Sequence, residues 1–189
     1  LWKTGNYAFT DLENTLGVIH IIRDPRNVIT SVLNHFDRDS YIHALEFMKN
    51  PLQCIGVKGG KSGNDLMTII SSWGNHYNSW KKFKKNNLLI KYENLINDPE
   101  KEFVKLCNFI EHVSDLKFEK KLILKVIENC DFNNLKKQEA SSGFLEGTTN
   151  KNNVKDKFFN LGPENNWKKL LNKEIKNEIE ILFEKEMID

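Results

Sequence analysis

The stretch VIHIIRDPRNVITS (residues 18–31) decides the fold. Its first five residues are apolar and mostly β-branched, with His20 as the only polar interruption, which predicts a buried strand. Charge appears abruptly at Arg23, and Asp24 followed by Pro25 is typical of a helix cap and a first helical residue. Apolar residues then recur at helical spacing. The stretch therefore predicts a strand that leads directly into an amphipathic helix, with an arginine at the junction.

A second unit of the same kind lies further along the chain. Residues 87–95, NLLIKYENL, predict a short apolar strand that runs into Tyr92. Asp98 and Pro99 then form a second helix start, and apolar residues follow at helical spacing. Because strand and helix alternate, we expect a parallel α/β sheet. We find no second domain boundary and therefore expect one domain over residues 1–189.

The rest of the chain divides into helices and loops. Helical spacing of apolar residues predicts helices over residues 65–85, 116–137 and 164–187. Turn-forming and polar residues predict loops over 50–64 and 139–153. The chain opens without a methionine, in what resembles the end of a strand, so we expect that an N-terminal portion of the domain is missing.

The composition excludes several classes of protein. The 189 residues include 28 basic and 26 acidic side chains, and the net charge of +2 is too small for a general nucleic-acid or membrane partner. No apolar run approaches the roughly 18 residues of a membrane span, and no signal peptide is visible. Cys54, Cys107 and Cys130 are odd in number and scattered, which predicts reduced core residues. We therefore expect a cytoplasmic protein, unless the missing N-terminal portion carries a signal.

The junction between the first strand and its helix has the residues of an anion site. In an open parallel sheet, ligands bind beyond the carboxyl ends of the strands, where helix N-termini present N–H groups. Arg23 lies at such an end, and Asn27, Ser31 and Asn34 share the polar face of the helix. An arginine, a helix N-terminus and a serine hydroxyl together favour phosphate binding. Alternatively, Arg23 pairs with Asp24 or another neighbour and Ser31 lies on a solvated face; these residues alone do not separate the two interpretations.

The same stretch resembles a motif of a known family. RDPRNVITS (23–31) is similar to the 3′-phosphate-binding motif of the sulfotransferases that use 3′-phosphoadenosine-5′-phosphosulfate (PAPS). In that family an arginine and a serine eight residues later hold the 3′-phosphate, which implies this role for Arg23 and Ser31. Three further blocks resemble the family in the same order: WGNHYNSW (73–80), LIKYENLINDPEKEFVKLCNFI (89–110) and FFNLGPENNWKK (158–169).

This resemblance implies the fold, the reaction and more of the site. The implied fold is P-loop NTPase-like, with three layers in which helices flank a central parallel sheet. The implied reaction transfers a sulfuryl group from PAPS to the hydroxyl or amine of a small-molecule or glycan acceptor, releases 3′,5′-ADP and uses no metal. Tyr92 takes the place of the tyrosine that contacts the adenine, and the backbone N–H of Gly162 is expected to approach a phosphate.

The sequence also departs from the family. The family's 5′-phosphosulfate loop is absent, as expected if an N-terminal portion is missing; GGKSGND (59–65) imitates it but comes after the 3′ motif, and we interpret it as a coincidental turn. Lys3 matches the family's lysine near the transferred group, whereas Gly5 replaces the histidine that serves as base. Asn160 and Leu161 replace an arginine and a lysine.

These departures leave alternatives open. If the usual base is lost, a neighbouring histidine or carboxylate has to replace it, and His35 and His43 are the nearest candidates in sequence to the 3′-phosphate helix. A non-catalytic nucleotide-binding protein of the same fold is the alternative to a working enzyme. A P-loop nucleotide kinase or NTPase is a further alternative, but it needs a Gly-rich loop ending in Lys-Ser/Thr after a first strand and an aspartate for Mg²⁺, and the sequence has neither in the right order. The loops over 38–64 and 139–157 would set the acceptor and show no readable preference, and a free sheet edge would favour a homo-dimer.

Overall fold

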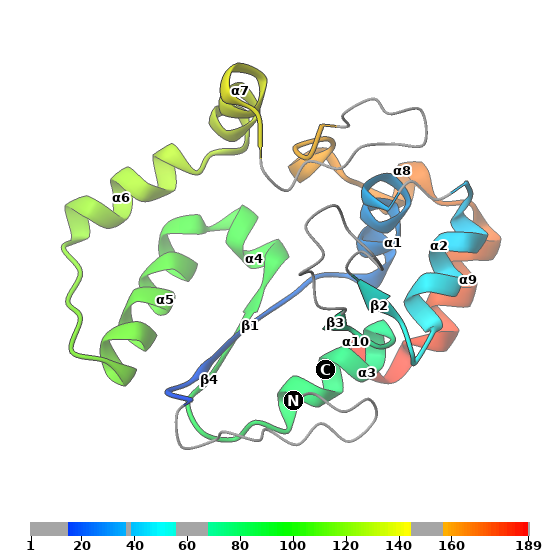
Figure 1. Cartoon of the computed structure of the whole chain (residues 1–189), viewed down its shortest axis with the longest axis horizontal. Helices are drawn as coiled ribbons and strands as arrows, with labels where there is room; N and C mark the ends of the chain where they lie inside the picture. Colours follow the sequence, from blue (N-terminus) through cyan, green and yellow to red (C-terminus); the bar gives the residue numbers. More distant parts are fainter. Residues whose placement is uncertain (1–14, 37–38, 56–67, 145–156, 189) are drawn as a thin grey trace, which may run out of the picture.

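Figure 1 shows the chain as a computed structural model in which helices lie on both sides of a central pair of strands. The structure describes residues 15–36, 39–55, 68–144 and 157–188. The strands are β1 (Val18–Ile22), β2 (Cys54–Ile55), β3 (Thr68–Ile69) and β4 (Asn87–Lys91). The helices are α1 (Pro25–His35), α2 (Tyr41–Lys49), α3 (Trp73–Lys81), α4 (Tyr92–Asn97), α5 (Pro99–Val113), α6 (Lys120–Asn129), α7 (Phe132–Ser142), η1 (Gly162–Glu164), α8 (Trp167–Leu170), α9 (Lys173–Leu182) and α10 (Glu184–Ile188).

β1 and β4 form a parallel pair, as predicted. Val18 lies opposite Asn87, and the register continues without a break to the ends of both strands. Strands that run in the same direction end at the same edge of a sheet. The residues that follow them, Arg23 and Tyr92, therefore come together although they are far apart in the sequence.

The two faces of β1 differ in burial. Val18 and His20 are buried toward α3, where the ring of His20 lies 5.7 Å from the ring of Tyr77. Ile19 and Ile21 point to the opposite face and are 43% and 56% exposed. The prediction of a wholly buried strand is therefore wrong, because α3 packs on β1 whereas the helix on the other side, α5, packs on β4.

Both predicted helix starts are confirmed. The side chain of Asp24 accepts a hydrogen bond from a backbone N–H in the first turn of α1 at 2.9 Å, and Pro25 is the first helical residue. Asp98 caps α5 in the same way at 3.1 Å, with Pro99 as its first residue. Each carboxylate satisfies an N–H group that the helix itself leaves without a partner.

The largest hydrophobic cluster fixes the orientation of α1. The helix contacts α2 and α9, and it buries Ile29 and Val32 between them. The buried members of this cluster are Ile29, Val32, Ala44, Leu45, Phe47, Met48, Ile175, Ile179 and Phe183. With its apolar side held there, the helix presents Ser31 toward the carboxyl ends of β1 and β4.

The helix predicted over residues 65–85 begins later than expected. It starts at Trp73, where the side chain of Ser72 caps the first turn. The preceding residues form β3, which pairs antiparallel with β2 inside the predicted loop of 50–64. Residues 65–67 lie outside the described ranges. Ladder hydrogen bonds between the two short strands thus replace the first predicted helical turns.

The other two predicted helices are interrupted. The helix over 116–137 is two helices, since the carboxylate of Asp131 caps α7 just beyond the end of α6. The helix over 164–187 is divided likewise, because Asn172 caps α9 after α8 has ended. Side chains that bond to the backbone offer it an alternative to continuing the helix.

Within the described ranges, no helix is both long and apolar enough to cross a membrane.

The cysteines agree only partly with the predicted core positions. Cys107 is buried in α5, and burial raises the pKa of its thiol. Cys54 is half-buried, whereas Cys130 is exposed at the end of α6. All three are free thiols. The prediction of a core position is therefore confirmed for Cys107 and wrong for Cys130, which is exposed and follows the last residue of α6.

Candidate functional site

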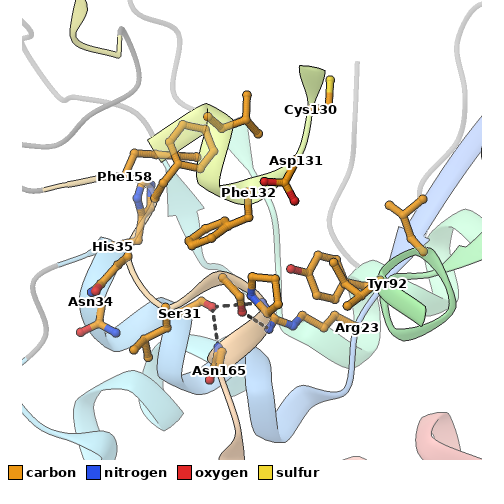
Figure 2. A pocket seen from close by; sticks show the side chains of 18 of the residues that line it. Arg23, Ser31, Asn34, His35, Tyr92, Cys130, Asp131, Phe132, Phe158 and Asn165 are labelled. Atoms are coloured by element: carbon orange, nitrogen blue, oxygen red, sulfur yellow. Dashed lines mark hydrogen bonds between the residues drawn. The ribbon is translucent and has the colours of Figure 1, made fainter. Parts of the chain in front are cut away.

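A cavity of about 1400 Å³ opens beyond the carboxyl ends of β1 and β4. Residues of α1, α4 and α7 line it together with the segment 157–165 (Figure 2). Arg23, Ser31, Tyr92 and Gly162, the residues predicted to bind the nucleotide, all lie in its wall. This edge of a parallel sheet is where ligands of α/β proteins usually bind.

The guanidinium of Arg23 is only loosely engaged by protein partners. Its Nη1 lies 3.5 Å from Ser31 Oγ, and its Nη2 lies 3.5 Å from the carbonyl oxygen of Gly162. Both distances are long for N–H···O hydrogen bonds. The Nε is buried and has no hydrogen-bond partner among the described residues. The group therefore keeps donor capacity for an anion placed in the cavity.

The ring of Tyr92 supports this guanidinium from one side. The Cζ atom of Arg23 lies 4.2 Å from the ring centroid, close enough for a cation–π attraction. Tyr92 is the first residue of α4 and follows β4 directly. The parallel register thus brings the tyrosine of one strand–helix unit onto the arginine of the other.

Asp24 does not pair with Arg23. Its carboxylate is bound by Arg26 at 2.7 Å, and Arg26 also binds Glu180 of α9 at 2.7 Å. The hydrogen bond to Asp24 is the main cause that raises the pKa of Arg26, and Arg26 in turn lowers the pKa of Glu180. The guanidinium of Arg26 also lies 4.2 Å over the ring of Trp167. The alternative in which Arg23 pairs with Asp24 is therefore wrong.

The three polar residues on this face of α1, Asn27, Ser31 and Asn34, have different partners. Ser31 is the member that faces Arg23 (Figure 2). Asn27 accepts a hydrogen bond from the backbone N–H of Trp167 at 3.0 Å and so holds the C-terminal segment in place. Asn34 lines the cavity, and its amide donates to a backbone carbonyl one turn earlier at 2.9 Å.

Gly162 occupies a position that requires glycine. Its φ of 51° lies in the left-handed region, and a Cβ atom built there would lie 2.2 Å from the ring of Phe132. Its carbonyl oxygen faces Arg23. The expected approach of its N–H to a phosphate stays a prediction.

The similarity to known proteins extends over nearly the whole chain. A model of the sulfotransferase domain family matches residues 10–189. The chain belongs to the sulfotransferase family. It is 25% identical over 178 residues to sulfotransferase 1B1 of Canis lupus familiaris, covering 93% of this chain and 56% of that protein. It is 28% identical over 175 residues to sulfotransferase 2A1 of Macaca fascicularis, covering 91% and 56%.

Two solved structures share the fold of this sulfotransferase chain. Mouse sulfotransferase SULT7A1 complexed with PAP aligns with a TM-score of 0.61 at 22% identity, over 90% of this chain and 58% of that one. Retinol dehydratase in complex with androsterone and inactive cofactor PAP aligns with a TM-score of 0.64 at 16% identity, over 93% and 48%. The predicted α/β fold of this family is thus confirmed. The chain spans about half the length of the curated relatives it matches.

Two residues in the wall of this cavity were not predicted from the sequence. Asn165 is buried after η1, and its Nδ2 lies 3.2 Å from Ser31 Oγ. Phe132 begins α7 and lies against Gly162. No sequence pattern marks Asn165 as a site residue, because it lies at the start of the helix predicted over 164–187. The sequence did contain a signal for the helix that begins at Phe132, because the preceding Asp131 is a typical helix cap.

Of the departures from the family sequence, only Asn160 and Leu161 fall within the described residues. Lys3, Gly5 and the segment 59–65 lie outside the described residues, so their interpretations stay predictions. Asn160 and Leu161 do line the cavity. The side chains that replace the family's arginine and lysine therefore lie at the site and bring no positive charge to it.

The two candidate replacement bases lie in different places. His35 lines the cavity, one turn beyond Ser31, and its ring meets the ring of Phe158 edge-on at a centroid distance of 5.7 Å. His43 is exposed, with its Nδ1 3.7 Å from the carboxylate of Asp39. The structure therefore brings His35, rather than His43, next to the predicted phosphate-binding residues (Figure 2).

Proposed function

We propose that this chain binds PAPS in the cavity and belongs to an enzyme that transfers the sulfuryl group to an acceptor hydroxyl or amine. The observation that carries the proposal is the convergence of the Arg23 guanidinium and the Ser31 hydroxyl, with the Arg23 Nε buried and unpaired among the described residues. A 3′-phosphate at this point accepts hydrogen bonds from both side chains. The PAP bound in the two structural neighbours supports this choice of nucleotide.

The aromatic wall of the cavity suits the adenine. The rings of Tyr92 and Phe132 both face the cavity near Arg23 (Figure 2). A flat heterocycle gains from stacking on such rings. The volume of about 1400 Å³ exceeds the roughly 300–1,000 Å³ of most small-molecule pockets, which leaves room for an acceptor beside the nucleotide.

The chemistry needs a base and stabilisation of the leaving group. The acceptor oxygen forms a bond to sulfur, the bond from sulfur to the bridging phosphate oxygen breaks, and 3′,5′-ADP leaves with the negative charge. His35 takes the proton of the acceptor hydroxyl, because it lines the same cavity and lies one turn from Ser31. Lys3 stabilises the leaving oxygen; this role rests on its match to the family motif.

A non-catalytic nucleotide-binding protein is the second candidate. Asn160 and Leu161 favour it, because they line the cavity where the family has two cations. Both candidates bind 3′,5′-ADP, but the enzyme alone turns over PAPS. Incubation of the protein with PAPS and a panel of phenol, alcohol, amine and glycan acceptors separates the two, with release of 3′,5′-ADP as the readout. A kinase would instead prefer ATP with Mg²⁺ to 3′,5′-ADP.

Calorimetric titration tests the nucleotide site itself. The protein is titrated with 3′,5′-ADP and with 5′-AMP, which lacks the 3′-phosphate. We expect Arg23→Ala and Ser31→Ala each to weaken 3′,5′-ADP binding by about tenfold or more, as loss of a hydrogen bond to a charged group does. Ser114→Ala, at the end of α5 and remote from the cavity, is the matched serine control. Equal affinities of the wild-type protein for both nucleotides would overturn the proposal.

A further inference from the structure

Asn165 connects the C-terminal segment to the middle of α1. Its side chain is buried, with 6% of the residue exposed. Its Nδ2 donates to the carbonyl oxygen of Asn27 at 3.0 Å and to Ser31 Oγ at 3.2 Å. Its Oδ1 lies 2.6 Å from the hydroxyl of Thr30. One amide thus contacts three residues of α1 and uses both of its N–H donors.

These contacts determine which way the amide points. The carbonyl oxygen of Asn27 can only accept, so it requires the Nδ2 side of Asn165. Exchanging the two amide atoms would place Oδ1 against that carbonyl, which is repulsive. The Thr30 hydroxyl lies 2.6 Å from Oδ1 and 2.7 Å from the carbonyl oxygen of Asn27, and because a hydroxyl can donate or accept, it is compatible with this orientation without requiring it. The atom that Asn165 presents to Ser31 is therefore an N–H donor.

This donor decides how the Ser31 hydroxyl is used. Its oxygen receives an N–H group from Asn165 at 3.2 Å, which occupies one acceptor position, and Arg23 Nη1 approaches it more loosely at 3.5 Å. Its hydrogen can point to the carbonyl oxygen of Asn27 at 3.5 Å, but that oxygen already receives the shorter bond from Asn165. A bond of that length is weak. The hydroxyl hydrogen is therefore available to a stronger acceptor in the cavity.

We propose that Asn165 is a positioning residue that holds Ser31 as a hydrogen-bond donor to the 3′-phosphate. By doing so it sets how strongly the site discriminates a 3′-phosphorylated adenosine from an unphosphorylated one. The inference rests on the proposed function and assigns within it a residue that the phosphate does not need to touch.

The test compares two nucleotides rather than one. Affinities for 3′,5′-ADP and 5′-AMP are measured by titration, and their ratio reports the contribution of the 3′-phosphate. We expect Asn165→Ala to lower this ratio by about tenfold, with 5′-AMP affinity within about twofold of wild type. Asn166→Ala is the matched control, since the neighbouring amide is exposed and caps only the backbone of α8. It should leave both affinities unchanged.

A second variant keeps the test decisive if Asn165→Ala does not fold. Asn165→Ser keeps a small hydrogen-bonding side chain and adds no charge, but it lacks the amide N–H that donates to Ser31. Its ratio should also fall. A role that is only structural would weaken both nucleotides equally and leave the ratio unchanged, which would overturn the inference. If the wild-type protein itself fails to prefer 3′,5′-ADP, the proposed function fails and the inference with it.

Discussion

The carboxylate of Glu93 accepts a hydrogen bond from the backbone N–H of Asp24 at 2.9 Å. Each residue directly follows a member of the site, since Glu93 comes after Tyr92 and Asp24 comes after Arg23. The bond therefore joins the two strand ends at the point where the guanidinium and the ring meet. The site depends on this connection because the two segments lie far apart in the sequence.

Glu93→Ala should weaken both stability and nucleotide binding. The substitution leaves the half-buried backbone N–H of Asp24 without its hydrogen-bond acceptor, which costs about 1 kcal/mol of unfolding free energy. It also loosens the placement of Arg23 and Tyr92, so affinity for 3′,5′-ADP should fall severalfold. Glu93→Gln keeps a carbonyl oxygen in place and should stay near wild type in denaturant unfolding and in titration. If the two variants are equally damaged, the charge rather than the hydrogen bond is what matters.

Gly162→Ala should destabilise the protein through two separate causes. The left-handed backbone conformation costs an L-residue about 1–2 kcal/mol, and the added methyl group collides with Phe132. Removing the Phe132 ring should remove the collision but leave the cost of the left-handed backbone conformation. In chemical denaturation, we expect the cost of Gly162→Ala to be smaller in a Phe132→Ala background than in the wild type. The same cost in both backgrounds would show that the ring does not restrict this position.

His35→Asn should impair turnover without impairing nucleotide binding. A general base contributes about 10²–10⁴-fold to the rate, so kcat should fall within this range. The KM for PAPS and the affinity for 3′,5′-ADP should change by less than about twofold. His43→Asn is the control, because its ring is exposed and outside the cavity wall. A His35→Asn enzyme with wild-type kcat would assign the base elsewhere.

Folding stability should fall as the pH decreases from 6.5 toward 4. Burial, and secondarily the neighbouring His76, lower the pKa of His20 from 6.5 to about 4. Between these values the unfolded chain binds a proton that the folded protein excludes, so the contribution is complete above pH 6.5 and is lost as the pH falls toward 4. At about 1.4 kcal/mol per pKa unit, the loss from this group is about 3 kcal/mol.

Denaturant unfolding at a series of pH values checks this expectation. His20→Phe keeps an aromatic ring against Tyr77 and should flatten the decline between pH 6.5 and 4. His112→Phe, on the exposed side of α5, should leave the decline as it is. A wild-type slope in the His20→Phe protein would show that other groups, such as His76, whose pKa desolvation also lowers, dominate in this range.

The strand–helix unit around Arg23 could be predicted because its signals are local. An apolar run, an aspartate followed by proline and helical spacing each act within a few residues, and the cap geometry of Asp24 agrees with them. The spacing of Arg23 and Ser31 also determines that both lie near one strand end. The parallel pairing followed from the repetition of the unit at Tyr92.

The contacts that complete the site were decided by the tertiary structure. Asn165 reaches Ser31 across 134 positions of sequence, and no periodic pattern marks such a pair. Phe132 closes over Gly162 only because α7 begins where α6 breaks. Arg26, rather than Arg23, binds Asp24 because Glu180 and Trp167 of the C-terminal segment hold its guanidinium. The local sequence thus determined which residues carry the donors, and packing between distant segments determined which donors remain for a ligand.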